Sequence, residues 1–376
     1  MKIKNKIIEF VKKETVLTAA MVLAVLSAVM IPPDTEYIGY IDFRTLAILF
    51  CLMTVMAGLQ KLGIFRRVAR ILLQHTNNVI ALAEILVLLC FFFSMLITND
   101  VALITFVPFT FTVLCLSGEE AVRKLAVPVV VLQTIAANLG SMLTPIGNPQ
   151  NLYLYGKIQM SPIAFIKLML PYSAVSLLFL LICTAVAAKH SGIAVRDVAG
   201  ALQAEDAGQE TAGWRRYLPV FYLILFLLCL LTVAHMIPYP VTLGIVVLGV
   251  GILDRATIGK VDYSLLLTFV GFFIFIGNIG RMPAFCSFLQ KIIEGREVMT
   301  AVAASQVISN VPAALLLSGF TENVKALIVG TNLGGLGTLI ASMASQIPGE
   351  KKRYFGWFTV ANVGFLLPLL FINGLL

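Results

Sequence analysis

Charged side chains are scarce in this chain of 376 residues. Asp, Glu, Lys and Arg make up 12% of it, whereas a soluble domain carries about a quarter. Hydrophobic residues make up 59%, so we expect a polytopic membrane protein. The net charge of +8 does not point to nucleic acid, because Lys and Arg stand in short runs between apolar stretches, as in loops that set membrane orientation.

Residues that commonly carry catalysis are also few. The six cysteines form no CxxC pair, and the three histidines have neither carboxylate nor cysteine neighbours. The sequence contains no GxxxxGK[ST] loop and no HExxH motif. We therefore expect neither an enzyme nor an ATPase, and no cofactor beyond a coupling ion, Na⁺ or H⁺.

Long apolar runs fill the rest of the chain, and a membrane span needs about 20 such residues. The first run follows a basic segment without a small-x-small cleavage site, so we expect an uncleaved first span. Two further apolar segments, 79–116 and 297–320, carry the polar tips ITND and ISNVP. Each is either two spans or one re-entrant hairpin, and the shortness of 297–320 favours the hairpin. The crossings are expected near 15–31, 43–60, 121–156, 162–188, 217–237, 240–253, 262–280, 322–346 and 354–375.

Two of these crossings contain polar breaks, NLGSMLTPIGNPQN over 138–151 and NLGGLGTL over 332–339. Hydrocarbon cannot satisfy an open backbone, so such a break persists only where protein or a water-filled cavity surrounds it. Both breaks are therefore candidate binding sites. The alternative is that their small polar residues only pack helices together.

The two halves of the chain repeat one another. Asp42–Phe65 matches Asp262–Phe285 at a constant offset of 220, and the hairpin tips and the two NLG breaks match in the same order. Each half has an odd number of crossings, so the second copy is expected upside down in the bilayer, as in secondary transporters. The predicted fold is an all-α polytopic membrane protein of two inverted structural repeats, each with a re-entrant helical hairpin and a broken transmembrane helix.

This pattern divides the chain into five parts. We expect an N-terminal cytoplasmic segment with the first transmembrane helix over 1–36, the first repeat over 37–188, a cytoplasmic linker over 189–216, connecting transmembrane helices over 217–260, and the second repeat over 261–376. An orientation with a cytoplasmic N-terminus and an outer C-terminus assigns 20 of the 27 Lys and Arg residues to the inner side. The protein should then lie in a plasma or inner membrane.

The tips and breaks offer the groups that a desolvated ion needs. Amide and hydroxyl oxygens and freed carbonyls suit Na⁺ or H⁺, whereas half-helix N-termini suit an anion. Candidate substrate or ion ligands are Thr98, Asn99, Asp100, Asn138, Thr144, Gly147, Asn148, Asn151, Ser309, Asn310, Thr331, Asn332 and Thr338. Candidate Na⁺ ligands among them are Asn99, Asp100, Asn148 and Asn310.

Asp100 stands apart as an acidic residue on the first tip. A carboxylate at the bilayer centre costs about 2.5 to 3.5 kcal/mol, so we expect it to be functional. Its counterpart in the repeat is Val311, which carries no charge. The first half should therefore hold the stronger coupling-ion site. The alternative is a protonated Asp or a helix cap.

The order of a TND tip, the TPIGNPQN break, an SNVP tip and a TNLGG break resembles the ion transporter superfamily, which includes arsenite permeases, sodium/proton antiporters, citrate-transporter-like proteins and divalent-anion:sodium symporters. The resemblance covers nearly the whole chain. It implies that the two tips touch substrate and Na⁺, and that the protein forms a homodimer. The chain departs from the symporter tips at Asp100 and Val311.

These features predict a secondary active transporter of a small anion, an inorganic oxyanion or a carboxylate, coupled to Na⁺ or H⁺ by alternating access. One alternative is arsenite or antimonite efflux, or cation/proton antiport, centred on Asp100. Another is a channel or a membrane subunit without a transport cycle. The expected partners are the small anionic substrate and the lipid bilayer.

Overall fold

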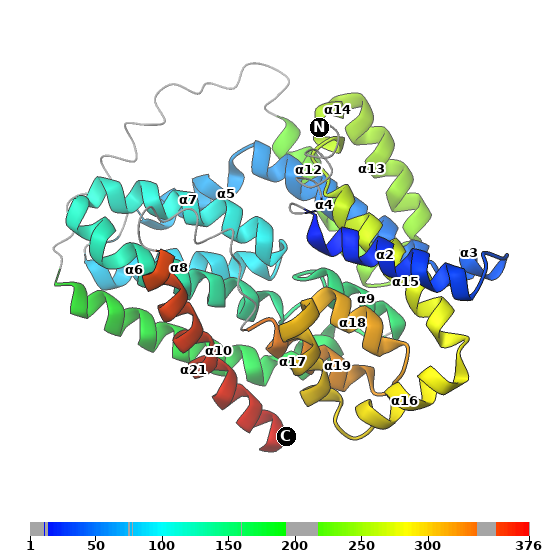
Figure 1. The fold of residues 1–376 in the computed structure, drawn as a ribbon. Coiled ribbons are helices and arrows are strands. Elements are labelled where there is room, and N and C mark those ends of the chain that lie inside the picture. Colours follow the sequence, from blue (N-terminus) through cyan, green and yellow to red (C-terminus); the bar gives the residue numbers. More distant parts are fainter. Residues whose placement is uncertain are drawn as a thin grey trace, which may run out of the picture. The chain divides into compact units, whose positions relative to one another are not determined.

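The computed structural model describes residues 14–73, 78–158, 160–192, 217–336 and 351–375, together with Val11 and Thr76. All regular elements in these ranges are helices, which confirms the predicted all-α class (Figure 1). The helices are α2 (Thr15–Met30), α3 (Glu36–Tyr40), α4 (Phe43–Lys61), α5 (Ile64–Leu73), α6 (Val79–Ser94), α7 (Asn99–Ser117), α8 (Glu119–Ser141), α9 (Pro149–Lys157), α10 (Pro162–Ser191), α12 (Leu218–Val233), α13 (Tyr239–Leu253), α14 (Arg255–Ile258), α15 (Tyr263–Gly280), α16 (Pro283–Ile293), α17 (Glu297–Ile308), α18 (Asn310–Ser318), α19 (Val324–Gly334) and α21 (Lys351–Leu375).

Six helices within the described ranges are long and apolar enough to cross a membrane. They are α4, α7, α8, α10, α15 and α21, the last over Arg353–Leu375. Five of them fall in predicted crossings. The sixth, α7, is an arm of the predicted first hairpin, so helix length leaves both interpretations of 79–116 open.

The two predicted hairpins differ in the lengths of their helical arms. Helices α17 and α18 have 12 and 9 residues, which gives about 18 and 14 Å at a rise of 1.5 Å per residue. Neither reaches across a hydrocarbon layer of about 30 Å. These lengths fit a hairpin over 297–320, although its re-entry into a membrane stays a prediction.

The first break follows α8, whose 23 residues span about 35 Å. The predicted crossing 121–156 is therefore two helices, α8 and α9, with the irregular segment between them. Because α8 is long enough to cross by itself, a position of the break at mid-membrane also stays a prediction.

The chain forms two compact units, and each is described by itself. The first unit covers Met1–Ala57, Gly156–Ile158 and Leu225–Thr331. In it α2 packs along α15, where the Asn278 amide donates to Ser27 Oγ at 3.0 Å and to the Tyr37 hydroxyl at 2.8 Å. Helices α17 and α18 pack against each other, and α18 contacts α15.

The second unit covers Gly58–Tyr155, Gln159–Ile224 and Asn332–Leu376. Its centre is α8, which contacts α6, α7, α10 and α21 (Figure 1). Every residue from Leu125 to Ser141 is buried, as expected for a helix that is apolar on all faces. Gly140 allows the closest approach, because a Cβ atom there would lie 2.0 Å from the Phe91 carbonyl oxygen of α6. This contact fixes the end of α8 beside the first hairpin.

Matching positions of the sequence repeat share local geometry. Asp42 and Asp262 each accept a hydrogen bond from the backbone N–H three residues later, both at 3.0 Å, at the starts of α4 and α15. On the two tips, Asn99 and Asn310 each accept from the next N–H, at 2.9 and 3.0 Å. The inverted orientation of the two copies is not tested by these contacts and stays a prediction.

Candidate functional site

The break between α8 and α9 folds around the end of α8. Asn148 Nδ2 donates to Ser141 Oγ at 2.6 Å, and Asn151 Nδ2 donates to the carbonyls of Ser141 and Thr144, both at 3.4 Å. The last carbonyls of a helix have no partner within it, so the Asn151 amide satisfies the Ser141 carbonyl that the end of α8 leaves open, whereas Asn148 bonds to the Ser141 side chain. At Gly147 a Cβ atom would lie 2.1 Å from the Ser141 carbonyl oxygen. Only glycine fits there.

Four asparagines of the second unit join this break to the first tip and to the second break. Asn99 Nδ2 donates to Asn138 Oδ1 at 2.9 Å, and Asn138 Nδ2 donates to the Gly335 carbonyl at 3.3 Å. Asn332 Nδ2 donates to Asn151 Oδ1 at 2.6 Å. All four are buried, between 0% and 9% exposed. We call Asn99, Asn138, Asn151 and Asn332 the amide cluster.

The first tip and the first break also meet through Thr144, whose hydroxyl donates to the Met95 carbonyl at the end of α6. Together with the Asn99–Asn138 bond, this contact brings the predicted tip residues beside the predicted break residues. Thr98 is the N-cap residue of α7, and its side chain makes no capping bond. The structure thus brings Asn99 of the predicted tip together with Asn138 and Thr144 of the predicted break.

Asp100 lies outside the buried part of this set. It is exposed and occupies the first turn of α7, where the helix N-terminus favours a carboxylate. Its backbone N–H donates to Asn99 Oδ1 at 2.9 Å. The acidic group thus lies at the surface end of the tip, one residue from the amide cluster.

The remaining predicted ligands are in the second half of the sequence. Ser309 and Asn310 are half-buried in the first unit, and Ser309 has a φ of 74°, a conformation that is strained for a residue with a Cβ atom. Thr331, in the same unit, donates to the Leu327 carbonyl of its own helix at 2.7 Å. Thr338 lies outside the described residues. A contact between the second tip and the second break stays a prediction.

Gln150 is a candidate site residue that the sequence did not predict. It is the second residue of α9 and 1% exposed, and neither Nε2 nor Oε1 of its amide has a hydrogen-bond partner among the residues that the structure describes. A buried polar group left without a partner destabilises by about 1–3 kcal/mol, so proteins seldom keep one without a reason. The available signal was the unbroken polar run Asn148-Pro149-Gln150-Asn151 at a helix start. The Gln150 amide can both donate to an anion oxygen and accept from a hydroxyl.

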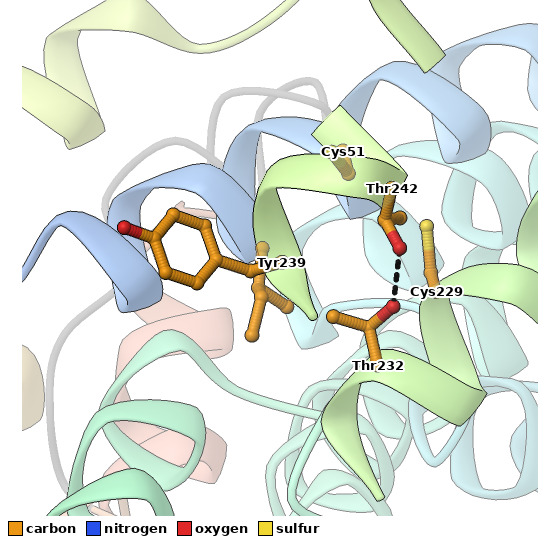
Figure 2. A pocket seen from close by; sticks show the side chains of 6 residues that line it. Cys51, Cys229, Thr232, Tyr239 and Thr242 are labelled. Carbon is orange, nitrogen blue, oxygen red and sulfur yellow. Dashed lines mark hydrogen bonds between the residues drawn. The ribbon is translucent and has the colours of Figure 1, made fainter. Parts of the chain in front are cut away.

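A pocket in the first unit differs in chemistry from the amide cluster. Figure 2 shows Cys51, Cys229, Tyr239 and the Thr232–Thr242 pair around it; the two threonine hydroxyls are 2.5 Å apart and bond to each other. The two threonine hydroxyls thus satisfy each other, which is typical of helix packing. Among the described residues there is no group of three His, Cys, Asp or Glu side chains that could hold a metal ion.

Several span-length helices and a buried amide cluster at a helix break are characteristic of a polytopic membrane transporter. Comparison with known proteins agrees. The profile of the citrate transporter family matches residues 7–326, and the chain belongs to this family. It is therefore a membrane transporter and not an enzyme, as the sequence predicts, and the resemblance to the ion transporter superfamily is confirmed.

Individual relatives lead to the same class. The chain is 32% identical to the inner membrane protein YbiR of Escherichia coli K12, over 87% of this chain and 85% of the relative. It is 30% identical to the uncharacterised transporter MJ0456 of Methanocaldococcus jannaschii, over 83% and 82% of the two chains. A shorter match of 142 residues, 33% identical, is to the silicon efflux transporter LSI3 of rice, Oryza sativa subsp. japonica, over 38% of this chain and 28% of that protein.

Proposed function

We propose that the protein is a secondary active transporter of a small oxyanion or monocarboxylate, coupled to Na⁺ or H⁺, and that the amide cluster with Gln150 binds the substrate. The observation that carries this proposal is the pair of bonds that link the two breaks, Asn332 to Asn151 and Asn138 to the Gly335 carbonyl. A substrate that replaces these bonds contacts both halves of the sequence at once. Alternating access needs such a ligand, because it must favour one of two arrangements of the halves.

The chemistry of the cluster favours a small substrate of low charge. Its four side chains are amides, which donate and accept hydrogen bonds but carry no formal charge. The N-terminus of α9 adds backbone N–H groups and a partial positive charge at Gln150 and Asn151. Burying a tricarboxylate beside neutral amides would leave several charges without counter-ions, at a high desolvation cost. A monovalent oxyanion or carboxylate avoids that cost.

The second candidate substrate is a weak inorganic oxyacid, and the transporter would then export it from the cell. The observation that favours it is the 33% identity with a silicon efflux transporter over 142 residues. Silicic, arsenous and antimonous acids are small, hydroxylated and mostly uncharged at neutral pH. Hydroxyl groups would donate to the Oδ1 and Oε1 atoms of the cluster and accept from its N–H₂ groups.

Asp100 is the proposed coupling residue. It lies at the exposed end of the first tip, next to Asn99 of the cluster, and a carboxylate there can take up a proton or bind Na⁺. The cytoplasmic N-terminus and the homodimer expected from the sequence belong to this proposal as well.

Flux into proteoliposomes tests the proposed function. Phosphate, nitrate, acetate, citrate, arsenite and silicate are supplied singly, with a Na⁺ gradient, a proton gradient or neither. We expect one small anion or weak inorganic oxyacid to accumulate only with a gradient. The variants Asn151→Ala and Asn332→Ala should each reduce that flux at least tenfold. Asn362→Ala, a buried asparagine on α21 of the same unit, is the matched control and should keep most of the flux. Flux that ignores both gradients, or that both cluster variants retain, would refute the proposal.

A further inference from the structure

Two cysteines of the first unit line one pocket. Cys51 lies on α4 and Cys229 on α12, far apart in the sequence, and Figure 2 shows both beside the threonine pair. The two thiols are near enough to hydrogen-bond to each other. Both are free thiols, and each cysteine is 1% exposed. The fold thus builds a buried pair of thiols from two separate helices. We call Cys51 and Cys229 the dithiol.

The other groups that line this pocket are uncharged at neutral pH. They are Ile48, Thr232, Tyr239 and Thr242. The hydroxyls of Thr232 and Thr242 bond to each other at 2.5 Å. Tyr239 is half-buried, whereas the remaining lining side chains are buried. The dithiol is therefore closed in on most sides, and the side chain of Tyr239 marks where the pocket approaches the surface.

The size of the pocket argues against a hydrated ion. The space among the described side chains that line it does not admit a water molecule. Mg²⁺ usually keeps several of its waters when it binds, and Ca²⁺ takes six or more oxygen ligands. Neither is suited to a dry pocket with two sulfur atoms. A thiophilic ion differs, because thiolate ligands replace its water shell.

The charge of the complex decides which thiophilic ion fits. A cysteine binds metal as the thiolate, so each sulfur that binds gives up its proton. Two thiolates with a monovalent ion would leave a net charge in an uncharged pocket, at a high desolvation cost. Two thiolates with a divalent ion form a neutral complex. Hg²⁺ is divalent and binds two sulfur atoms in line, whereas Zn²⁺ prefers four ligands.

We propose that the dithiol binds one divalent thiophilic metal ion, of which Hg²⁺ is the type, and that the ion bridges α4 and α12. Each sulfur forms one bond to the metal and loses one proton to solvent. One Hg²⁺ and two thiols thus give one neutral bis-thiolate and two protons. The dithiol belongs to the first unit and the amide cluster to the second, so this site is distinct from the proposed substrate site.

Mercury retained by the intact protein tests the site. The protein is incubated with HgCl₂, washed with an excess of a monothiol to remove ions that a single sulfur holds, and desalted before the metal is counted. We expect one Hg²⁺ per chain in the parent protein. Cys51→Ala and Cys229→Ala should each retain at least tenfold less. The matched control is Cys90→Ala, which removes a buried cysteine of the second unit and should retain as much as the parent.

Two further measurements need no variant, so poor folding of a variant cannot decide the result. X-ray absorption at the mercury edge should show two sulfur neighbours and no oxygen neighbour in the parent protein. Zn²⁺, supplied in place of Hg²⁺, should be lost in the monothiol wash, because the dithiol provides only two of the four ligands that it prefers.

Each contrary outcome overturns the proposal. Equal retention by the parent and either dithiol variant would place the mercury at another cysteine, as would a loss in Cys90→Ala. A single sulfur neighbour would show that the two thiols do not share one ion. Zn²⁺ held as firmly as Hg²⁺ would show that the site is not a two-sulfur site.

Discussion

Asn332 Nδ2 donates to Asn151 Oδ1 at 2.6 Å across 181 residues of sequence. Both side chains are buried, at 2% and 0% exposure, and each belongs to a different helix break. This hydrogen bond therefore connects the two helix breaks. In the proposed function it is one of the contacts that the substrate replaces.

The strength of this link is testable by a double-mutant cycle. Asn151→Ala and Asn332→Ala should each lower the free energy of unfolding by about 1–3 kcal/mol, because each removes this buried hydrogen bond between the two amides. The double variant should lose less than the sum, since both partners are then gone. Thermal unfolding in detergent gives the midpoints, and additive losses would show that the two amides do not depend on each other.

Gln150 should lower the stability of the protein while it supports transport. Gln150→Leu removes a buried amide that has no hydrogen-bond partner in the described part of the chain, and it keeps a similar side-chain volume. We therefore expect the protein to unfold at the same or a higher temperature. Substrate flux should fall at least tenfold, because the amide that would meet the substrate is gone. Loss of stability together with unchanged flux would make Gln150 a structural residue.

Gly147 should tolerate no side chain. In Gly147→Ala the new Cβ atom would lie 2.1 Å from the Ser141 carbonyl oxygen, so the break must open and the bonds of Asn148 and Asn151 must shift. We expect a loss of folded protein or of substrate flux. Gly356→Ala on α21 is the matched control, because a Cβ atom there meets nothing within 4 Å; in a helix this exchange stabilises by up to about 1 kcal/mol. Equal behaviour of the two variants, by size-exclusion profile and flux, would contradict the geometry at Gly147.

Asp100→Asn tests the coupling assignment. It removes the acid from the first tip and preserves side-chain shape, so substrate binding should remain while gradient-driven accumulation stops. The measurement is uptake with and without an imposed proton or Na⁺ gradient, beside counterflow exchange, which needs no gradient. Glu84→Gln, at a half-buried acid of α6, is the control. Accumulation that persists in Asp100→Asn would move the coupling site to another residue.

The sequence predicted the class of fold and some of the contacts at the candidate site, for identifiable physical reasons. Apolar runs and sparse charge determine a helical membrane protein, and polar residues that interrupt them stand out wherever they pack. The contact of the Asn99 tip with the first break was predicted in this way. The bond from Asn151 to Asn332 was not, because no local periodicity encodes a contact across 181 residues.

Gln150 escaped prediction for a related reason. Its neighbours Asn148 and Asn151 are of the same chemical type, and all three stand at one helix start. The folded structure distinguishes them: the Asn148 and Asn151 amides bond to Ser141 at the end of α8, whereas the Gln150 amide is buried with no partner within the described ranges. Whether a polar side chain is satisfied depends on packing, which residue type alone does not encode.

Ligand binding tests the central claim, that the amide cluster is the substrate site, most directly. Thermal unfolding of the purified protein is followed with small oxyanions, monocarboxylates, citrate, arsenite and silicate, since a ligand stabilises the state that it binds. The account predicts that one small anion or weak inorganic oxyacid raises the unfolding temperature of the parent protein and of Asn362→Ala, but not of Asn332→Ala. An equal rise in Asn332→Ala, or a rise with citrate alone, would contradict it.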